Sequence, residues 1–216
     1  MRNRFDRQLL ELNNELIQMG SLIEQAIEMG ISALVKQDVE KAEQAIKFDV
    51  EVDEQEKTIE ALCMKLLLQQ QPVAKDLRLI SAALKMITDM ERIGDQADDI
   101  AEILLCRAGR PLSAGDTLRD MAQATIRMVS ESVDAYVRQD VDLAQQVIAA
   151  DDEVDGYFDR IKAHLIDRIA KDVDDGEATL DLLMIAKYYE RIGDHATNIA
   201  EWVMFSVTGV HKTETT

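Results

Sequence analysis

An acidic motif occurs twice in this chain, and its side chains have the chemistry of metal ligands. Each copy places three acids at the same spacing, namely Glu91, Asp95 and Glu102 in the first and Glu190, Asp194 and Glu201 in the second. A helix turns by about 100° per residue, so the three acids of each copy lie within about 40° of one another on one face. Buried carboxylates repel one another and lose hydration, so they need a proton, a cationic side chain or a bound cation.

A second acid pair precedes each motif. Asp49 and Asp53 are four residues apart, as are Asp151 and Asp155, and each pair shares a helix face with apolar residues. We expect both pairs to point inward and, if their helix packs antiparallel to the motif helix, to meet the motif acids. Four carboxylates in one place favour Mg²⁺, Ca²⁺, Mn²⁺ or iron, and no thiolate is present there for zinc.

The sequence therefore predicts divalent or trivalent metal ions bound to these ten carboxylates. The open alternative is that the acids are solvated or pair with nearby cations. Those cations are Arg78, Lys85, Arg92 and Arg191. The same acidic positions recur in both halves, and this recurrence favours the metal site.

Other residues of the motif are interpreted differently. Gly94 and Gly193 interrupt helical patterns, where glycine costs about 1 kcal/mol against alanine, so we expect another helix to approach closely there. Arg92 and Arg191 lie about 100° from the acid face and are expected at the surface. The last turns of the motif differ between the halves.

His195 stands about 140° from the acid face of the second motif and is not expected to be a ligand. It is replaced by glutamine in the first copy. Asp98 and Asp99 become Thr197 and Asn198 in the second copy, so they are weaker candidates than the shared acids.

The apolar spacing predicts long helices that bring these acids together. The first is expected to end near Lys36, and Asp38 then has the character of an N-cap. A second helix should run to about Leu68, and a third should begin near Val73 after a turn at residues 69–72. Helices of roughly 23 to 35 residues are expected throughout.

The second half repeats the first. The segment 35–39 matches 137–141, and Gly and Pro residues separate the halves. We predict an all-α fold of two tandem three-helix bundles. The expected divisions are a first repeat at 1–108, a linker at 109–115, a second repeat at 116–206 and a mobile tail at 207–216.

Composition limits the classes of function. The 216 residues carry a formal net charge of -18, which argues against a nucleic-acid partner. Cys63 and Cys106 form no disulfide pattern and are expected to be reduced thiols. There is no apolar signal region and no apolar run of about 18 residues, so we expect a cytoplasmic protein that does not insert into a membrane.

The motifs ERIGD at 91–95 and ERIGDHATNIAE at 190–201, together with QPVAKDLR at 71–78, resemble the PhoU family. The resemblance covers nearly the whole chain apart from about the last ten residues. It implies two three-helix bundles, often as a homodimer, with metal clusters at Glu91 and Asp95 and at Glu190 and Asp194.

The same resemblance implies a role and partners. Family members act with the ATP-binding-cassette phosphate transporter, here through its ATPase subunit, and with the phosphate sensor histidine kinase. They keep the phosphate-starvation response off when phosphate is abundant and so serve intracellular phosphate homeostasis. The chain would then be a negative regulator rather than an enzyme, cytoplasmic and at the inner membrane only through its protein partners.

Two other functions fit the residues. A helical di-metal carboxylate protein, such as an iron store or an oxidase, also uses inward acids. That class needs Glu-x-x-His motifs, and no Glu in this chain has a His three residues later. A plain helical adaptor without metal is the third hypothesis. Stoichiometric metal in the purified protein would separate it from the other two.

Overall fold

The structure, a computed structural model, describes residues 2–36, 38–70, 72, 74–107, 110, 112, 115–171 and 176–210. Within this part the chain forms six helices and no strand. They are α1 (Arg2–Lys36), α2 (Val39–Gln70), α3 (Ala74–Cys106), α4 (Asp116–Arg138), α5 (Val141–Ala170) and α6 (Gly176–Thr208). The predicted all-α fold is confirmed, and the helices have 23 to 35 residues as expected.

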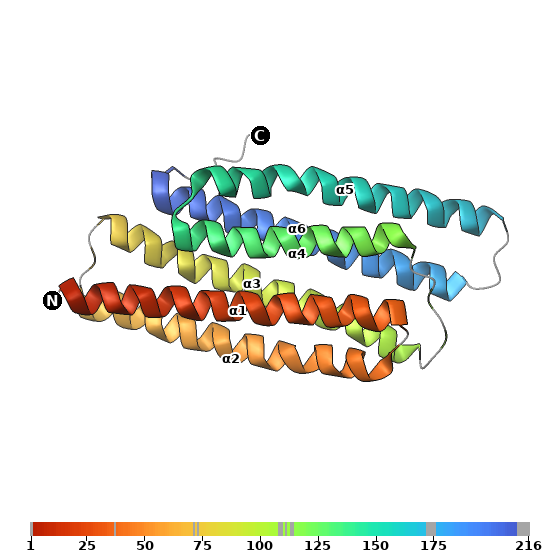
Figure 1. The fold of residues 1–216 in the computed structure, drawn as a ribbon, viewed down its shortest axis with the longest axis horizontal. Helices are drawn as coiled ribbons and strands as arrows, with labels where there is room; N and C mark the ends of the chain where they lie inside the picture. Colours follow the sequence, from red (N-terminus) through yellow and green to blue (C-terminus); the bar gives the residue numbers. More distant parts are fainter. Residues whose placement is uncertain are drawn as a thin grey trace.

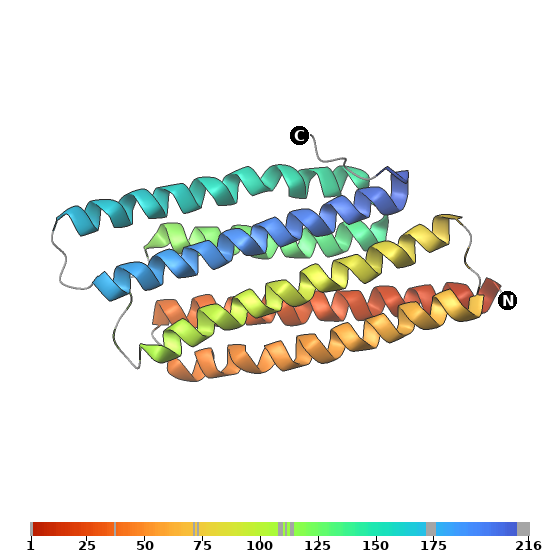
Figure 2. The same ribbon diagram turned by 180° about the vertical axis from the view of Figure 1, so that it is seen from behind.

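The helices form two three-helix bundles that lie side by side. Helices α1, α2 and α3 pack together, as do α4, α5 and α6. Between the bundles, α1 packs on α4 and α3 packs on α6. Figure 1 shows α1 and α4 in the middle of one face, and Figure 2 shows α3 and α6 in the middle of the other, so α2 and α5 form the outer edges. Each motif helix therefore lies at the seam, against an outer helix that carries the second acid pair.

The turn before each outer helix is fixed by the same cap. The Lys41 backbone N–H donates to Oδ1 of Asp38 at 3.3 Å. The Leu143 N–H donates to Oδ1 of Asp140 at 3.0 Å in the second half. These bonds satisfy N–H groups that the first helical turn leaves unpaired. The predicted N-cap at Asp38 is confirmed, and the repeat extends to this detail.

Some predicted connections fall on residues that the structure leaves out. Residue 71 of the first predicted turn, residue 73 at the predicted start of the third helix, residues 172–175 and most of the predicted linker lie outside the described part, as do residues 211–216 of the predicted tail. Val207 and Thr208 were expected in the tail, but α6 continues through both of them. Helix ends vary by one or two residues, so this difference is small.

One apolar core is shared by the two bundles. Leu16, Ile87, Val129 and Ile192, from four different helices, are all buried in it. The buried Tyr136 hydroxyl donates to the Leu79 carbonyl at 2.9 Å, linking α4 to α3. Burying apolar surface across the seam stabilises the pair of bundles as one unit.

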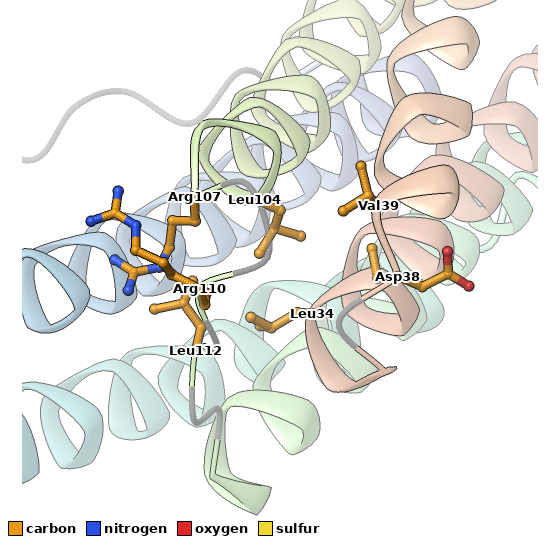
Figure 3. Close-up of a pocket in the computed structure, with 8 residues that line it drawn as sticks. Leu34, Asp38, Val39, Leu104, Arg107, Arg110 and Leu112 are labelled. Carbon is orange, nitrogen blue, oxygen red and sulfur yellow. The ribbon is translucent and has the colours of Figure 1, made fainter.

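Cationic side chains fasten the end of α3 to the second bundle. Arg107, whose side chain is only 4% exposed, lies 2.7 Å from Asp181, and Arg110 lies 2.6 Å from Glu177. Figure 3 shows both guanidinium groups pointing away from a cavity of about 30 Å³ that Leu112 helps to line. A cavity of this size has room for about a single water molecule.

The remaining sequence expectations concern thiols and membranes. Cys63 is buried and Cys106 exposed, and both are free, as predicted. Burial raises the pKa of the Cys63 thiol to about 12. No helix in the described part of the chain is long and apolar enough to span a bilayer.

Candidate metal centre

The outer helices approach the motif helices most closely at the motif glycines. A Cβ added to Gly94 would lie 3.1 Å from Cγ1 of Val52, and one added to Gly193 would lie 3.3 Å from Cγ1 of Val154 and 3.2 Å from Oδ1 of Asp151. The predicted close approach is therefore confirmed, and helix packing supplies it. The approach sets Asp151 directly against the second motif.

The same crossing assembles two groups of carboxylates. The first acidic cluster lies between α2 and α3, and the second lies between α5 and α6. Their members are Asp49, Asp53, Glu91, Asp95 and Asp98 in the first and Asp151, Asp155, Glu190 and Asp194 in the second. Glu102 and Glu201 stand further along the motif helices, exposed and half-buried respectively.

The motif acids lie at the edge of the apolar core and not inside it. In the first motif the fully buried positions are Met90, Ile93 and Ala97, so the acid face is turned away from the interior. The side chains of Glu91 and Asp95 are 22% and 35% exposed. The expectation that the second acid pairs point inward holds for Asp49 and Asp151, which are half-buried, but not for Asp53 and Asp155.

Exposure differs along each cluster. The Asp53 side chain is 43% exposed, and Asp155 and Asp194 are also exposed. Leu77, which precedes the first motif on the same face of α3, is 47% exposed. Interior positions are taken by apolar side chains from three helices, which leaves the carboxylates at the margin where water still reaches them.

The first cluster is centred on Asp49 and Asp98. Within the described residues, Oδ1 of each is buried and has no hydrogen-bond partner. Burial, followed by repulsion from Asp49 and Glu102, raises the pKa of Asp98 to about 6. Burial and repulsion from Asp53 also raise the pKa of Asp49. These two carboxyls are destabilised as anions in the absence of a cation.

The structure places Asp98 in the first cluster, although the sequence makes it a weaker candidate than the shared acids. It was judged weak because the second half has Thr197 there, yet it lies seven residues after Glu91 and so shares its helix face. That spacing was the available signal. The two clusters consequently differ, since Oδ1 of Asp98 is replaced by a neutral hydroxyl in the second half.

In the second cluster the most perturbed acid is Asp151. Burial and repulsion from Asp155 and Asp194 raise its pKa to about 6. The pKa of Asp194 is raised as well, by burial and by the charge of Glu190. The structure thus brings together the predicted pairs of the second half closely enough for their charges to interact.

Two cationic side chains already neutralise part of this charge. Nη1 of Arg92 lies 3.0 Å from Oδ2 of Asp95, and Nε lies 3.5 Å from Oε2 of Glu91. Lys187 pairs with Glu190 in the second half. Arg92 is at the surface as predicted, but its side chain folds back onto the acid face because its long apolar stem spans the angle between them. The alternative of cationic pairing therefore holds for part of each cluster.

The donors suit a hard cation, although their arrangement does not yet form a site. No three His, Cys, Asp or Glu side chains of the described part meet at a point where they would hold a metal ion. All donors of the two clusters are carboxylate oxygens, which suit Mg²⁺, Ca²⁺, Mn²⁺ or iron. The unpartnered oxygens of Asp49 and Asp98 also fit a missing cation. Closing such a site requires side-chain rotation.

His195 has a structural contact instead of a place in the second cluster. Its Nδ1 lies 2.9 Å from Oδ1 of Asp89, and the Asn198 amide donates to the same oxygen at 3.1 Å. These contacts join α6 to α3 across the seam. At the equivalent place in the other half, Tyr188 hydrogen-bonds to Asp99. Sequence reasoning did not identify Asp89 or Tyr188 as seam residues, because contacts between distant helices leave no local pattern.

Fold and clusters together define a tandem-repeat helical protein in which each three-helix unit carries one acidic cluster at its seam helix. The PhoU domain matches residues 16–104 and again residues 118–203. The chain belongs to the PhoU domain family. The resemblance seen in the sequence is therefore confirmed over both halves.

Individual relatives extend the similarity over almost the full length. A Clostridium acetobutylicum protein named phosphate-specific transport system accessory protein PhoU homolog is 38% identical over 212 residues, covering 96% of each chain. The crystal structure of PhoU from Pseudomonas aeruginosa superimposes with a TM-score of 0.89 at 32% identity, covering 95% of this chain and 100% of that one. A Streptococcus pneumoniae phosphate transport system regulatory protein PhoU gives a TM-score of 0.89 at 25% identity, covering 97% and 99%.

Proposed function

We propose that this chain is a negative regulator of phosphate uptake and of the phosphate-starvation response. The observation that carries the proposal is the full-length similarity, through both repeats, to relatives named as accessory proteins of phosphate-specific transport. The chain would act by binding and not by catalysis. Its partners would be the ATPase subunit of the phosphate transporter and the phosphate sensor histidine kinase.

The test is alkaline phosphatase activity in cells that lack the gene and grow with abundant phosphate. A repressor predicts high activity in the deletion strain and low activity when the intact gene is restored. Low activity in the deletion strain would reject the regulatory role. Co-purification with the ATPase subunit and with the kinase, each tagged in turn, tests the partners separately.

The proposal includes metal binding at the two acidic clusters. Asp49, Asp53, Glu91 and Asp95 would hold an ion in the first half, with Glu102 further along α3. Asp151, Asp155, Glu190 and Asp194 would do so in the second, with Glu201 further along α6. The bound ion would supply positive charge to carboxylates whose pKa values burial and mutual repulsion raise. Asp98 adds a donor to the first site alone.

Elemental analysis of protein purified without chelator tests the sites. Stoichiometric iron or manganese that falls in Glu91→Ala and Glu190→Ala would support them, and Glu43→Ala, an exposed acid on α2, is the matched control. A metal that binds only the folded state must also raise the melting temperature. An absence of metal, together with a melting curve that added Mn²⁺ does not move, would reject the sites.

We also propose that the protein acts in the cytoplasm as a homodimer and reaches the membrane only through its partners. Light scattering of the purified chain tests the dimer, and a monomeric mass at micromolar concentration would refute it. The alternative of an iron store or oxidase predicts oxygen-dependent oxidation of added Fe²⁺. The histidine nearest the second cluster, His195, is engaged by Asp89, which gives that alternative no support.

A further inference from the structure

The two bundles differ at one end, because α4 is much shorter than its counterpart α1. Helix α1 has 35 residues and reaches the end of α2 and the start of α3 (Figure 1). Helix α4 has 23 residues, whereas α5 has 30 and α6 has 33. The last turns of α5 and the first turns of α6 therefore extend beyond α4 (Figures 1 and 2). The third helix of the second bundle is incomplete there.

The uncovered end contains a cavity of about 510 Å³. Its apolar wall consists of Leu118, Ile161, Leu165 and Leu182, which retain 3% to 8% exposure. A volume in this range is typical of ligand and side-chain pockets. Exposed apolar side chains continue along both overhanging segments, with Ile169 of α5 58% exposed and Leu180 of α6 60% exposed.

The other side chains that line this cavity are mainly basic. Arg160, His164 and Arg168 follow one another at four-residue intervals along α5, so they form a row on one helix face. The row is notable in a chain with 42 acidic and 24 basic residues. It gives a strongly acidic molecule one cationic edge beside an apolar cavity.

Comparison of the repeats shows that two residues of this row, His164 and Arg168, stand at positions that belong to the core in the first bundle. Val52 and Val154 hold equivalent positions over the motif glycines. Counted from them, His164 stands where the first bundle has Leu62, and Arg168 stands where it has Leu66. Both leucines are buried, at 7% and 0% exposure. Within the described residues, the second bundle therefore lacks the turns that cover these positions in the first, and it has basic residues in place of the two leucines.

Two acids of the described chain near the row pair with cations outside it. Asp116 pairs with Arg119 at 3.4 Å, and Asp167 pairs with Lys171 at 2.5 Å. Arg160 stacks on the ring of Tyr157, 4.5 Å from its centroid. Within the described residues, no carboxylate forms an ion pair with the row. Its positive charge remains available to a ligand at the cavity.

We propose that this cavity docks an acidic amphipathic helix of a partner protein. The apolar face of that helix would take the place of the missing turns of α4, and its carboxylates would pair with Arg160, His164 and Arg168. The first bundle shows the geometry, because Phe5 and Leu12 near the start of α1 are buried in the equivalent arrangement. The proposal goes beyond the regulatory function and uses neither phosphate nor metal.

A second copy of this chain is a poorer occupant. The helical segment of the chain that corresponds to the missing turns is the start of α1, which carries Arg4 and Arg7 beside Asp6 and Glu11 and so lacks a uniformly acidic face. Like charges at an interface oppose association. A helix of opposite charge on another protein matches the row better.

The experiment uses the full chain and a fluorescein-labelled helical peptide of about 16 residues, with leucines at i, i+3, i+4 and i+7 and glutamates beside them. Fluorescence anisotropy at low salt measures binding. We expect saturable binding that weakens at least tenfold, about 1.4 kcal/mol, in Arg160→Glu/Arg168→Glu. Lys47→Glu/Lys65→Glu on α2 is the matched control, because it changes the net charge equally at exposed positions.

Several results would overturn the proposal. They are an absence of saturable binding up to about 1 mM peptide, equal binding by both double variants, and equal binding of a peptide with lysines in place of glutamates. If charge reversal instead changes the oligomeric state and not peptide binding, the occupant is a second copy. His164→Glu, at an exposed position, repeats the test should the double variant fail to fold, which circular dichroism reports.

Discussion

Replacement of Asp151 by asparagine should stabilise the metal-free protein at neutral pH. Oδ1 of Asp151 lies against Gly193, where an added Cβ would be 3.2 Å away; its charge is disfavoured first by burial and then by repulsion from Asp155 and Asp194. Asparagine has nearly the same shape but carries no charge. The substitution removes the cost of burying a charge and the repulsion, and leaves the packing in place.

The pKa of Asp151 is raised from 3.8 to about 6. A shift of this size corresponds to about 3 kcal/mol, and solvent screening of the partly exposed carboxyl reduces this to about 1 to 1.5 kcal/mol. The pKa of Asp151 is higher in the folded than in the unfolded state, so protonation of Asp151 favours the folded state. This stabilisation is complete below pH 3.8 and is lost as the pH rises through about 6. The gain from Asp151→Asn should therefore be greatest above pH 7 and about half as large at pH 5.

Thermal unfolding in chelator, followed by circular dichroism at pH 7.5 and pH 5, measures this gain. In a chain of this length we expect the melting temperature to rise by about 2 to 5 °C at pH 7.5 and by about half of that at pH 5. Asp159→Asn, an exposed acid on the same helix, is the control and should change little. A gain that does not fall with pH, or a loss at pH 7.5, would refute the cost assigned to the buried, ionised carboxyl of Asp151.

Four further substitutions test the helices, a helix cap and the packing between the bundles. Gly156→Ala should stabilise α5 by up to about 1 kcal/mol through helix propensity. Gly193→Ala should gain less or destabilise the protein, because its Cβ would meet Asp151 and Val154 at 3.2 and 3.3 Å. Urea unfolding compares the two variants, and equal gains in stability would contradict the close helix crossing. Asp140→Ala should lower the free energy of unfolding by about 0.5 to 2 kcal/mol through loss of the cap, and no change in the urea midpoint would count against it. Arg107→Ala should lower the free energy of unfolding by about 3 kcal/mol, because it leaves Asp181 without its cation at the seam. A melting temperature that is unchanged within error in calorimetry would mean that the ion pair does not hold the bundles together.

The sequence alone was sufficient for the helical architecture. The local and periodic signals were the apolar spacing, the cap at Asp38 and the repeated segments, and the structure contains the feature that each one predicted. The glycines of the motif also indicated a close helix crossing, because glycine within a helix is unfavourable unless a neighbouring group requires its small size. The candidate acids followed from the same helical periodicity.

Only the tertiary structure decided how those acids are placed. A helical wheel gives the angle of a side chain about its own helix, but the direction of the core depends on where the neighbouring helices pack. The core at the first motif lies toward Ile93 and Ala97, so the acids are at the margin, Arg92 reaches them, and Asp98 meets Asp49. The basic row on α5 could likewise be interpreted only once the short α4 was seen to leave it uncovered. Periodicity determines which residues share a face, whereas packing between distant segments determines what that face meets.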